Sequence, residues 1–262
     1  MKVSIITVNF NNAMGLKATL ESVSCQSYRD YEVIVIDGAS TDESVDVIKS
    51  YIPRIADLSY VSEKDSGIYN AMNKGIRMSS GDYLNFMNSG DIFCNELALE
   101  QITPFLQQEK AIVTGIGYAE NYKIRPPKPT ELSLTFFLKN SMNHQAAFIK
   151  AAVMKRYMYN ENYKIVSDTE FFFKALVLDN CSYLDVSVNV CACEKAGASG
   201  NLNESLQERY RAIKALLPER MSPDADFIIK YDNPIIRCIG NVLYNKFFRL
   251  LYDKIIRRGR RI

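Results

Sequence analysis

Residues 81–91 (GDYLNFMNSGD) join a buried strand to a polar turn. Gly81 ends a helical pattern, Tyr83–Met87 is rich in residues that suit a buried strand, and the last four residues are turn formers that end in Asp91. In open α/β sheets, ligands bind beyond the carboxyl ends of the strands. The pattern therefore places a carboxylate where a metal ion or a phosphate would bind. The alternative is an ordinary turn without a ligand.

A second carboxylate, Asp37, follows the apolar run 32–36 in the same way. We expect strands at 3–8, 32–36, 58–61 and 82–87, with helices at 13–24, 40–51 and 66–80 between them. Strands separated by helices pair in parallel through right-handed crossovers. The sequence therefore predicts an α/β fold with a mainly parallel sheet and helices on both faces, which brings Asp37 and Asp91 to the same edge.

Helix starts are indicated by capping residues. We expect caps at Asn11 and Asn12 for helix 13–24, Ser40 with Glu43 for helix 40–51, Asp65 for helix 66–80, and Ser167 with Glu170 for a helix over 168–178. In the two Ser-x-x-Glu capping boxes, each side chain would bond the other residue's backbone N–H group.

The second half of the chain is mixed. We expect helices at 95–107 and 132–139, strands at 111–116, 145–149 and 183–190, and an antiparallel partner strand at 118–124. The pattern is helical from residue 203 to the end. This predicts one large α/β domain over 1–200 and a helical carboxyl-terminal region over 201–262.

Composition fits an ordinary globular protein. The chain has 262 residues, 47% hydrophobic and 24% charged, and a net charge of +2, which gives no reason to expect a nucleic-acid partner. The amino terminus lacks the features of an export signal, so we expect a cytoplasmic protein with reduced thiols. Cys191 and Cys193 have the wrong spacing for a CxxC motif, and their side chains would share one face of a strand.

The order of four motifs carries a family resemblance: 3–11 (VSIITVNFN), 33–42 (VIVIDGASTD), 65–75 (DSGIYNAMNKG) and 88–91 (NSGD). The chain resembles family-2 glycosyltransferases with the GT-A fold, above all bacterial enzymes that build surface polysaccharides such as O-antigen or capsule. Residues 143–145 (NHQ) and 167–170 (SDTE) match more weakly.

The resemblance implies an inverting transfer of a sugar from a nucleotide-sugar donor to a hydroxyl of a glycan or lipid-linked acceptor. Such a reaction needs groups that bind the nucleotide, a cation for the diphosphate leaving group and a base for the acceptor hydroxyl. By similarity, the nucleotide-binding residues are Thr7, Asn9, Asp37, Asp65 and Asn88, the ligand of Mg²⁺ or Mn²⁺ is Asp91, and the general base is Asp168.

One departure concerns the metal. Many relatives carry Asp-x-Asp where this chain has Asn88-Ser89-Gly90, which leaves Asp91 as the sole carboxylate of the turn. One carboxylate can still hold Mg²⁺ with phosphate oxygens and waters. A metal-free site is the alternative.

Asp168 as base competes with a structural role, because carboxylates in a first helical turn also stabilise the helix. Glu170 is the second candidate base. His144, the single histidine, is expected near the phosphates, the metal or the acceptor, although a lone histidine is more often structural.

Residues 234–262 combine apolar residues at helical spacing with eight Lys and Arg residues and one Asp. This pattern is typical of a helix on a membrane surface, here the inner face of the plasma membrane, but also of a helix packed on its own domain.

Two other function classes use a similar sheet. A sugar nucleotidyltransferase would carry a glycine-rich phosphate loop with a basic residue, which 9–12 (NFNN) lacks. A catalytically inactive nucleotide-sugar-binding module would keep Asp37 and lose metal and base groups, as the Asn88 and Gly90 departures allow.

Overall fold

The computed structural model describes residues 1–119, 122–193 and 202–231. The chain divides into two compact units, residues 1–215 and 216–262. Nearly all of helix α8 (Leu202–Leu216) belongs to the first unit, although the sequence predicts a boundary after residue 200. The predicted basic helix at 234–262 lies outside the described residues.

The first half of unit 1 is a parallel sheet in the order β3-β2-β1-β4, as the alternating pattern predicts. Its strands are β1 (Val3–Asn9), β2 (Tyr31–Asp37), β3 (Leu58–Ser62) and β4 (Tyr83–Phe86). The connecting helices are α1 (Ala13–Ser24), α2 (Ser44–Tyr51) and α3 (Ile68–Met78).

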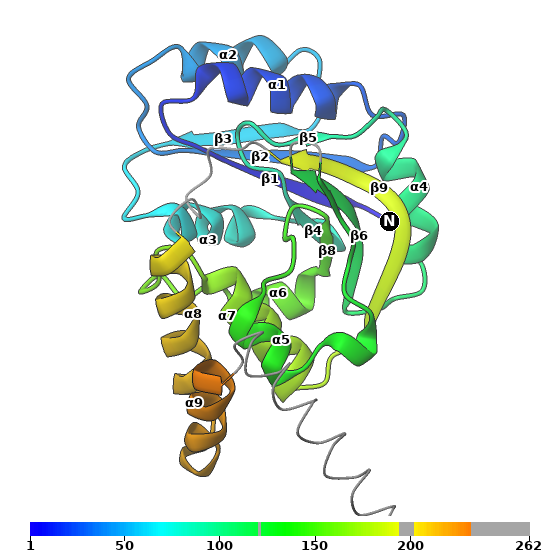
Figure 1. Ribbon diagram of the computed structural model, residues 1–262. Helices are drawn as coiled ribbons and strands as arrows, with labels where there is room; N and C mark the ends of the chain where they lie inside the picture. The colour runs from blue at the N-terminus through cyan, green and yellow to red at the C-terminus, as the bar shows by residue number, and fades with distance from the viewer. Residues whose placement is uncertain (120–121, 194–201, 232–262) are drawn as a thin grey trace, which may run out of the picture. The chain divides into compact units, whose positions relative to one another are not determined.

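Every residue of β1 and β2 is buried, because helices cover both faces of these strands. Figure 1 shows α1 and α2 on one face and α3 on the other. On the α3 face the packing is close, since a Cβ added to Gly75 would lie 2.5 Å from Ile6 Cγ2. On the opposite face, Val3, Ile5, Val33 and other fully buried side chains form one hydrophobic cluster with α1, α2 and α4.

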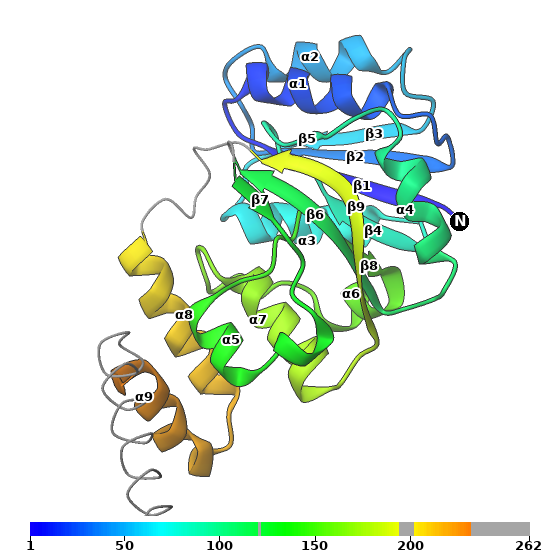
Figure 2. The ribbon, with the colours of Figure 1, turned by 45° about the vertical axis from the view of Figure 1, so that its right-hand side comes forward.

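The second half extends this sheet in the order β4-β8-β6-β9-β5, with β7 paired to β6. Its strands are β5 (Ile92–Phe93), β6 (Ile112–Ala119), β7 (Tyr122–Ile124), β8 (Ala147–Lys150) and β9 (Tyr183–Cys193). All of these pairings are antiparallel except that of β6 with β9, and Figure 2 shows β9 curving along the edge of the sheet. The predicted α/β class is thus confirmed, with parallel pairing concentrated in the first half.

The helices of this half are α4 (Ala98–Leu106), α5 (Leu134–Lys139), α6 (Ala151–Tyr157) and α7 (Ser167–Phe173), and α7 continues as a π-helix over Lys174–Leu178. Strand β5 and helix α6 have no counterpart among the predicted elements. Helix α9 (Ser222–Tyr231) belongs to unit 2. Within the described ranges, no helix has the length and apolar character that a membrane span requires.

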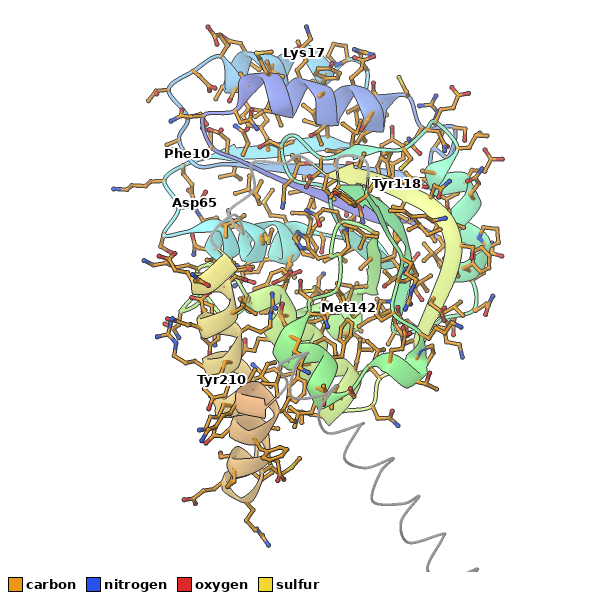
Figure 3. The ribbon with its side chains drawn as sticks, viewed as in Figure 1. Phe10, Lys17, Asp65, Tyr118, Met142 and Tyr210 are labelled. Atoms are coloured by element: carbon orange, nitrogen blue, oxygen red, sulfur yellow. The ribbon has the colours of Figure 1, made fainter. Side chains whose placement is uncertain are left out.

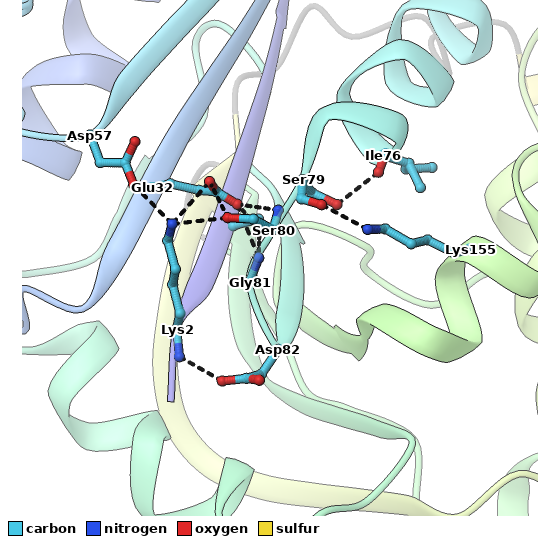
Figure 4. Close-up of polar contacts among 10 residues, drawn as sticks. Lys2, Glu32, Asp57, Ile76, Ser79, Ser80, Gly81, Asp82 and Lys155 are labelled. Atoms are coloured by element: carbon cyan, nitrogen blue, oxygen red, sulfur yellow. Dashed lines mark hydrogen bonds and ion pairs between the residues drawn. The ribbon is translucent and has the colours of Figure 1, made fainter.

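A buried carboxylate, Glu32, ties the amino ends of β1, β2 and β4 together (Figure 4). It accepts hydrogen bonds from the Ser4 hydroxyl (2.5 Å), the backbone N–H groups of Ser80 and Gly81 (2.6 and 3.0 Å) and the Lys2 ammonium (3.1 Å). Burial acts to raise the pKa of Glu32, but these hydrogen bonds prevail and lower it to about 2. The end of the sheet opposite to Asp37 and Asp91 is therefore held by a satisfied ionic network.

The predicted caps are only partly correct. Asn12 does accept a hydrogen bond from the Gly15 N–H (3.0 Å), but neither capping box forms. The Ser40 hydroxyl donates to Asp37 (2.6 Å) and its oxygen accepts from the Asn11 N–H (2.8 Å) instead of from a helix N–H group, and α2 begins later, at Ser44. Ser167 lies inside the first turn of α7, where its hydroxyl oxygen accepts from the Asn160 N–H (2.6 Å).

Asp65 does not cap its helix either, since α3 begins at Ile68 after Gly67. Gly67 has φ 153°, a backbone conformation that side chains disfavour, and the Asp65 carboxylate pairs instead with the Lys74 ammonium (2.6 Å). The Asp65 carboxylate therefore does not bond the first turn of α3, and it lies beside the edge of the sheet in its ion pair with Lys74.

Candidate functional site

A cleft of about 930 Å³ opens at the carboxyl ends of β1, β2 and β4. Its walls come from the loops after these strands, from α3, from residues 141–145, from the start of α7 and from α8. All of these segments belong to unit 1. The cleft lies where the strand pattern of the sequence predicts a ligand.

Asp37 ends β2 and lies directly behind one wall of this cleft. Its carboxylate accepts from the Asn9 side-chain amide (2.8 Å), the Ser40 hydroxyl (2.6 Å) and the Ser62 hydroxyl (2.6 Å). Burial acts to raise the pKa of Asp37, but these donors lower it below its ordinary value. The Asn9 amide is thereby fixed with its Nδ2 toward Asp37, and its buried Oδ1 has no hydrogen-bond partner.

Phe10, Gly38 and Asp65 form a narrow slot at the same end of the cleft. A Cβ added to Gly38 would lie 3.1 Å from the Phe10 ring and 3.2 Å from Asp65 Oδ2, so the absence of a side chain keeps these groups close to the backbone. Phe10 is 66% exposed, although it is aromatic, and Figure 3 shows it near Asp65 at one edge of the molecule's first unit. An exposed ring beside a carboxylate suits a flat heterocycle that also offers hydrogen-bond donors.

The turn after β4 is fixed by hydrogen bonds to Thr19 of α1. The Thr19 hydroxyl donates to the Asp91 carbonyl oxygen (2.7 Å) and accepts from the Gly90 N–H (3.0 Å). Gly90 has φ 101°, a conformation in which a side chain would be strained. The Asp91 carboxylate accepts from the Gln145 side-chain amide (3.1 Å).

A row of polar side chains crosses the middle of the cleft. Asn88 Nδ2 lies 3.4 Å from His144 Nε2, and His144 Nδ1 lies 3.2 Å from Asp168 Oδ2. The Tyr69 hydroxyl lies 3.2 Å from the other oxygen, Asp168 Oδ1, and 2.7 Å from the Ile165 carbonyl oxygen, so its single proton is shared between two acceptors. Because the Asn88 amide nitrogen can only donate, Nε2 accepts and the proton of the neutral ring lies on Nδ1, facing Asp168.

Burial acts to lower the pKa of His144, but the hydrogen bond to Asp168 and the charges of Asp168 and Asp91 raise it above its ordinary value. The side chains of His144 and Asp168 are only 17% and 12% exposed. The row therefore holds a carboxylate in one orientation while leaving part of it open to the cleft.

The structure brings six of the nine predicted site residues into the lining of one cleft: Asn9, Asp65, Asn88, Asp91, His144 and Asp168. Three lie elsewhere. Thr7 is fully buried within β1, Asp37 lies behind the wall, and Glu170 is buried against Lys174, with which it forms an ion pair (2.9 Å).

Three further residues of the cleft, Phe10, Tyr69 and Arg209, were not among the sequence candidates. Phe10 and Tyr69 lie inside the matched motifs, where their aromatic character was the available signal. Arg209 carries no such signal, because it reaches the cleft only through the packing of α8 against segments distant in sequence.

The described residues include no group of three or more His, Cys, Asp or Glu side chains that could hold a metal ion. The turn after β4 does offer oxygen ligands of the kind that Mg²⁺ and Mn²⁺ take. Asp91 supplies a carboxylate, and Asn88 supplies a buried amide oxygen with no hydrogen-bond partner. Two protein oxygens suit a cation whose remaining ligands come from a bound diphosphate and water.

Cys191 and Cys193 share one side of β9, as predicted, with their sulfurs 3.9 Å apart. Within the described residues, all cysteines are free thiols, and Cys238 lies outside that part of the chain.

Comparisons with known proteins agree with this geometry. The family "Glycosyl transferase family 2" matches residues 4–176. An uncharacterized glycosyltransferase of Mycobacterium tuberculosis is 31% identical over 210 residues, which cover 78% of this chain and 79% of that protein. A PGL/p-HBAD biosynthesis glycosyltransferase of Mycobacterium bovis is 28% identical over 172 residues, or 64% of this chain and 67% of that protein.

Solved structures show the same fold. S. aureus TarS 1–349 in complex with UDP-GlcNAc aligns with a TM-score of 0.67 at 20% identity, over 87% of this chain and 70% of that chain. A mannosyltransferase from Pyrobaculum calidifontis in complex with GDP-Man and Mn²⁺ aligns with a TM-score of 0.64 at 18% identity, over 86% of this chain and 69% of that chain.

Proposed function

We propose a specific reaction for this chain, which belongs to glycosyl transferase family 2 and is a nucleotide-sugar-dependent glycosyltransferase. The chain transfers a sugar, with inversion, to a hydroxyl of a glycan or lipid-linked acceptor in surface polysaccharide biosynthesis. The observation that carries this proposal is the orientation of Asp168. Its two carboxylate oxygens are held by Tyr69 and His144 within the cleft that also contains the nucleotide-side residues.

The donor nucleotide occupies the Phe10 end of the cleft. The base stacks on the exposed Phe10 ring, and Asp65 and the unpartnered Asn9 Oδ1 accept hydrogen bonds from the nucleoside. Asp37, although hidden behind the wall, fixes the Asn9 amide in the required orientation. Support for a uracil or guanine nucleotide comes from the TarS complex with UDP-GlcNAc and the mannosyltransferase complex with GDP-Man.

The diphosphate lies over the turn after β4, where Asp91 and Asn88 Oδ1 would hold Mg²⁺ or Mn²⁺. The cation supplies positive charge for the departing diphosphate. The chain's own contribution at this point is a rigid turn, because Thr19 and Gln145 fix the backbone and the carboxylate before any ligand binds.

Asp168 performs the proton transfer. The acceptor hydroxyl oxygen attacks the anomeric carbon while its proton passes to Asp168, and the bond from that carbon to the diphosphate oxygen breaks with its electron pair leaving on the diphosphate. Attack from the face opposite to the leaving group inverts the anomeric configuration. Tyr69 and His144 position the base, because each donates to one carboxylate oxygen.

The experiment that tests this proposal uses a panel of UDP- and GDP-sugars. The purified full chain is incubated with each donor, and release of the nucleoside diphosphate is followed with and without saccharide acceptors. Proton NMR of the product then reads its anomeric configuration. Release of nucleoside diphosphate with an inverted product supports the proposal, whereas retention of configuration or release of a nucleoside triphosphate contradicts it.

A further inference from the structure

Arg209 is a buried cation with no ion-pair partner among the residues that the structure describes. The residue is 9% exposed, and its guanidinium donates to the Lys139 carbonyl oxygen (2.8 Å) and to the Ser205 hydroxyl (3.4 Å). Its Nε has no hydrogen-bond partner, and it forms no ion pair with any residue in the described part of the chain. Burial of a charge without an ion pair is costly, so we expect an anionic ligand to stabilise Arg209.

Arg209 lines the same cleft as Asp168. Burial lowers the pKa of Arg209 below its ordinary value, while the negative charge of Asp168 acts in the opposite direction. Helix α8 is held against the segment before α7, because Glu208 accepts from the N–H groups of Lys164 and Ile165 (2.9 and 2.7 Å). In Figures 1 and 2, α8 lies beside α7, on the side of the sheet covered by α3.

The position of Arg209 distinguishes the two substrates. The nucleotide end of the cleft is built from the loops after β1 and β2 with Asp65, and the diphosphate position from the turn after β4. Arg209 instead follows Glu208, which accepts a hydrogen bond from the N–H group of Ile165, three residues before Asp168, the group that must touch the acceptor hydroxyl under the function proposed above. An anion at Arg209 therefore belongs on the acceptor's side.

We propose that Arg209 binds a phosphate group of the acceptor, so that the substrate class is a phosphate-bearing saccharide. A guanidinium presents a planar fork that matches phosphate oxygens, and the exposed Lys164 lines the same cleft as a second cation. Two cations beside one carboxylate suit a dianionic phosphate. This inference rests on the proposed glycosyl transfer, because only that reaction gives Asp168 its place next to an acceptor.

The test is a calorimetric titration of inorganic phosphate into the full chain saturated with UDP or GDP, whichever it binds. The nucleotide fills the donor's diphosphate position, so additional phosphate must bind elsewhere. Wild-type protein should bind it saturably, and R209M should bind it about tenfold more weakly or worse. R211M is the matched control, since Arg211 lies on the same helix but is exposed and does not line the cleft, and it should bind phosphate like the wild type.

R209K, which keeps the charge and loses the fork, covers the case in which R209M does not fold, and it too should bind phosphate more weakly. The nucleotide affinity of each variant is measured first. Wild-type phosphate binding by the nucleotide-loaded protein, lost in the Arg209 variants alone, supports the proposal. No phosphate binding by the loaded wild type, unchanged binding in both Arg209 variants, or a loss confined to nucleotide affinity overturns it. A wild type that binds neither UDP nor GDP contradicts the proposed function itself.

Discussion

At the scale of single residues, the carboxylate of Asp168 is held by hydrogen bonds that do not belong to a helix cap. Ser167 makes no capping box, yet Asp168 is held by Tyr69 from α3 and His144 from the loop before β8. Two donors from separate elements converge on a carboxylate that remains in a cleft. This arrangement favours the base over the structural role that the sequence leaves open.

Replacing Asp168 by Asn should lower kcat by roughly 10²–10⁴, because a general base acts in the transition state, and should leave the nucleotide Kd nearly unchanged. Steady-state kinetics and nucleotide titration check this. Glu170→Gln is the control, since Glu170 lies outside the cleft on the same helix, and it should retain turnover. Full activity of the Asp168 variant would remove Asp168 from catalysis.

Phe10→Ala should weaken nucleotide binding roughly 5- to 150-fold, since stacking on an aromatic ring contributes about 1–3 kcal/mol per base. Met14→Ala removes a similarly exposed side chain nearby, outside the cleft lining, and should leave the affinity unchanged. Titration calorimetry with UDP and GDP compares the two. Equal affinities for both variants and the wild type would place the base elsewhere.

Asp91→Asn should abolish any stimulation of turnover by Mg²⁺ or Mn²⁺, because the turn after β4 has no second carboxylate. Donor hydrolysis is measured with increasing metal and after EDTA treatment. Wild-type activity that is indifferent to EDTA would mean that the site works without a cation.

At the scale of elements, strands β1 and β2 explain why the first half of the fold is readable from sequence. Their seven-residue runs are buried throughout, so most positions are apolar, and each run ends at a polar residue, Asn9 or Asp37. The capping box predicted at Ser40 does not form, because the Ser40 oxygen accepts from the Asn11 N–H, a donor that is remote in sequence. Local spacing does not predict a cap where the fold brings in another donor.

The second half is harder to predict because its partners are remote. Strand β5 has two residues, and its pairing with β9 joins Ile92 to Ala192. Arg209 reaches the cleft through contacts with Lys139 and Ser205, of which the first lies 70 residues away. No local pattern encodes such a contact, so Arg209 could not be predicted from the sequence, whereas Asp168 and His144 could.

The ionic network at the amino ends of the strands gives a stability prediction. The folded-state pKa of Glu32 is about 2 and its ordinary value is 4.5, so its contribution is present above about pH 4.5 and is lost as the pH falls toward 2. Glu32→Gln should therefore lower the free energy of unfolding by about 2–3 kcal/mol at pH 7. The difference from wild type should shrink below pH 4.5.

Urea unfolding between pH 3 and pH 7 measures this difference. Asp57→Asn is the matched control, because Asp57 also pairs with Lys2 (2.8 Å) but is 56% exposed, and its effect should be much smaller. A pH-independent gap between Glu32→Gln and wild type would attribute the loss to packing instead of charge.

At the scale of the whole molecule, the cleft and the basic segment 234–262 lie in different units, so their functions should be separable. We expect the full chain to co-sediment with anionic vesicles at low salt and to be released at high salt, since each Lys or Arg near such a surface contributes about 1 kcal/mol. Deleting residues 234–262 should abolish co-sedimentation and preserve donor hydrolysis. Absence of vesicle binding by the intact chain would contradict a membrane-surface role.

The two ends of the parallel strands differ in whether their buried polar groups have hydrogen-bond partners. Glu32 finds donors within the chain, whereas the amide oxygens of Asn9 and Asn88 have none. A buried acceptor without a donor costs about 1–3 kcal/mol, so a ligand that donates to either amide oxygen should stabilise the folded protein. The donor thus becomes a structural component of the protein: at a hundred times its Kd it would add about 2.7 kcal/mol to the resistance to unfolding. The lifetime of this enzyme in a cell should then follow the supply of activated sugar.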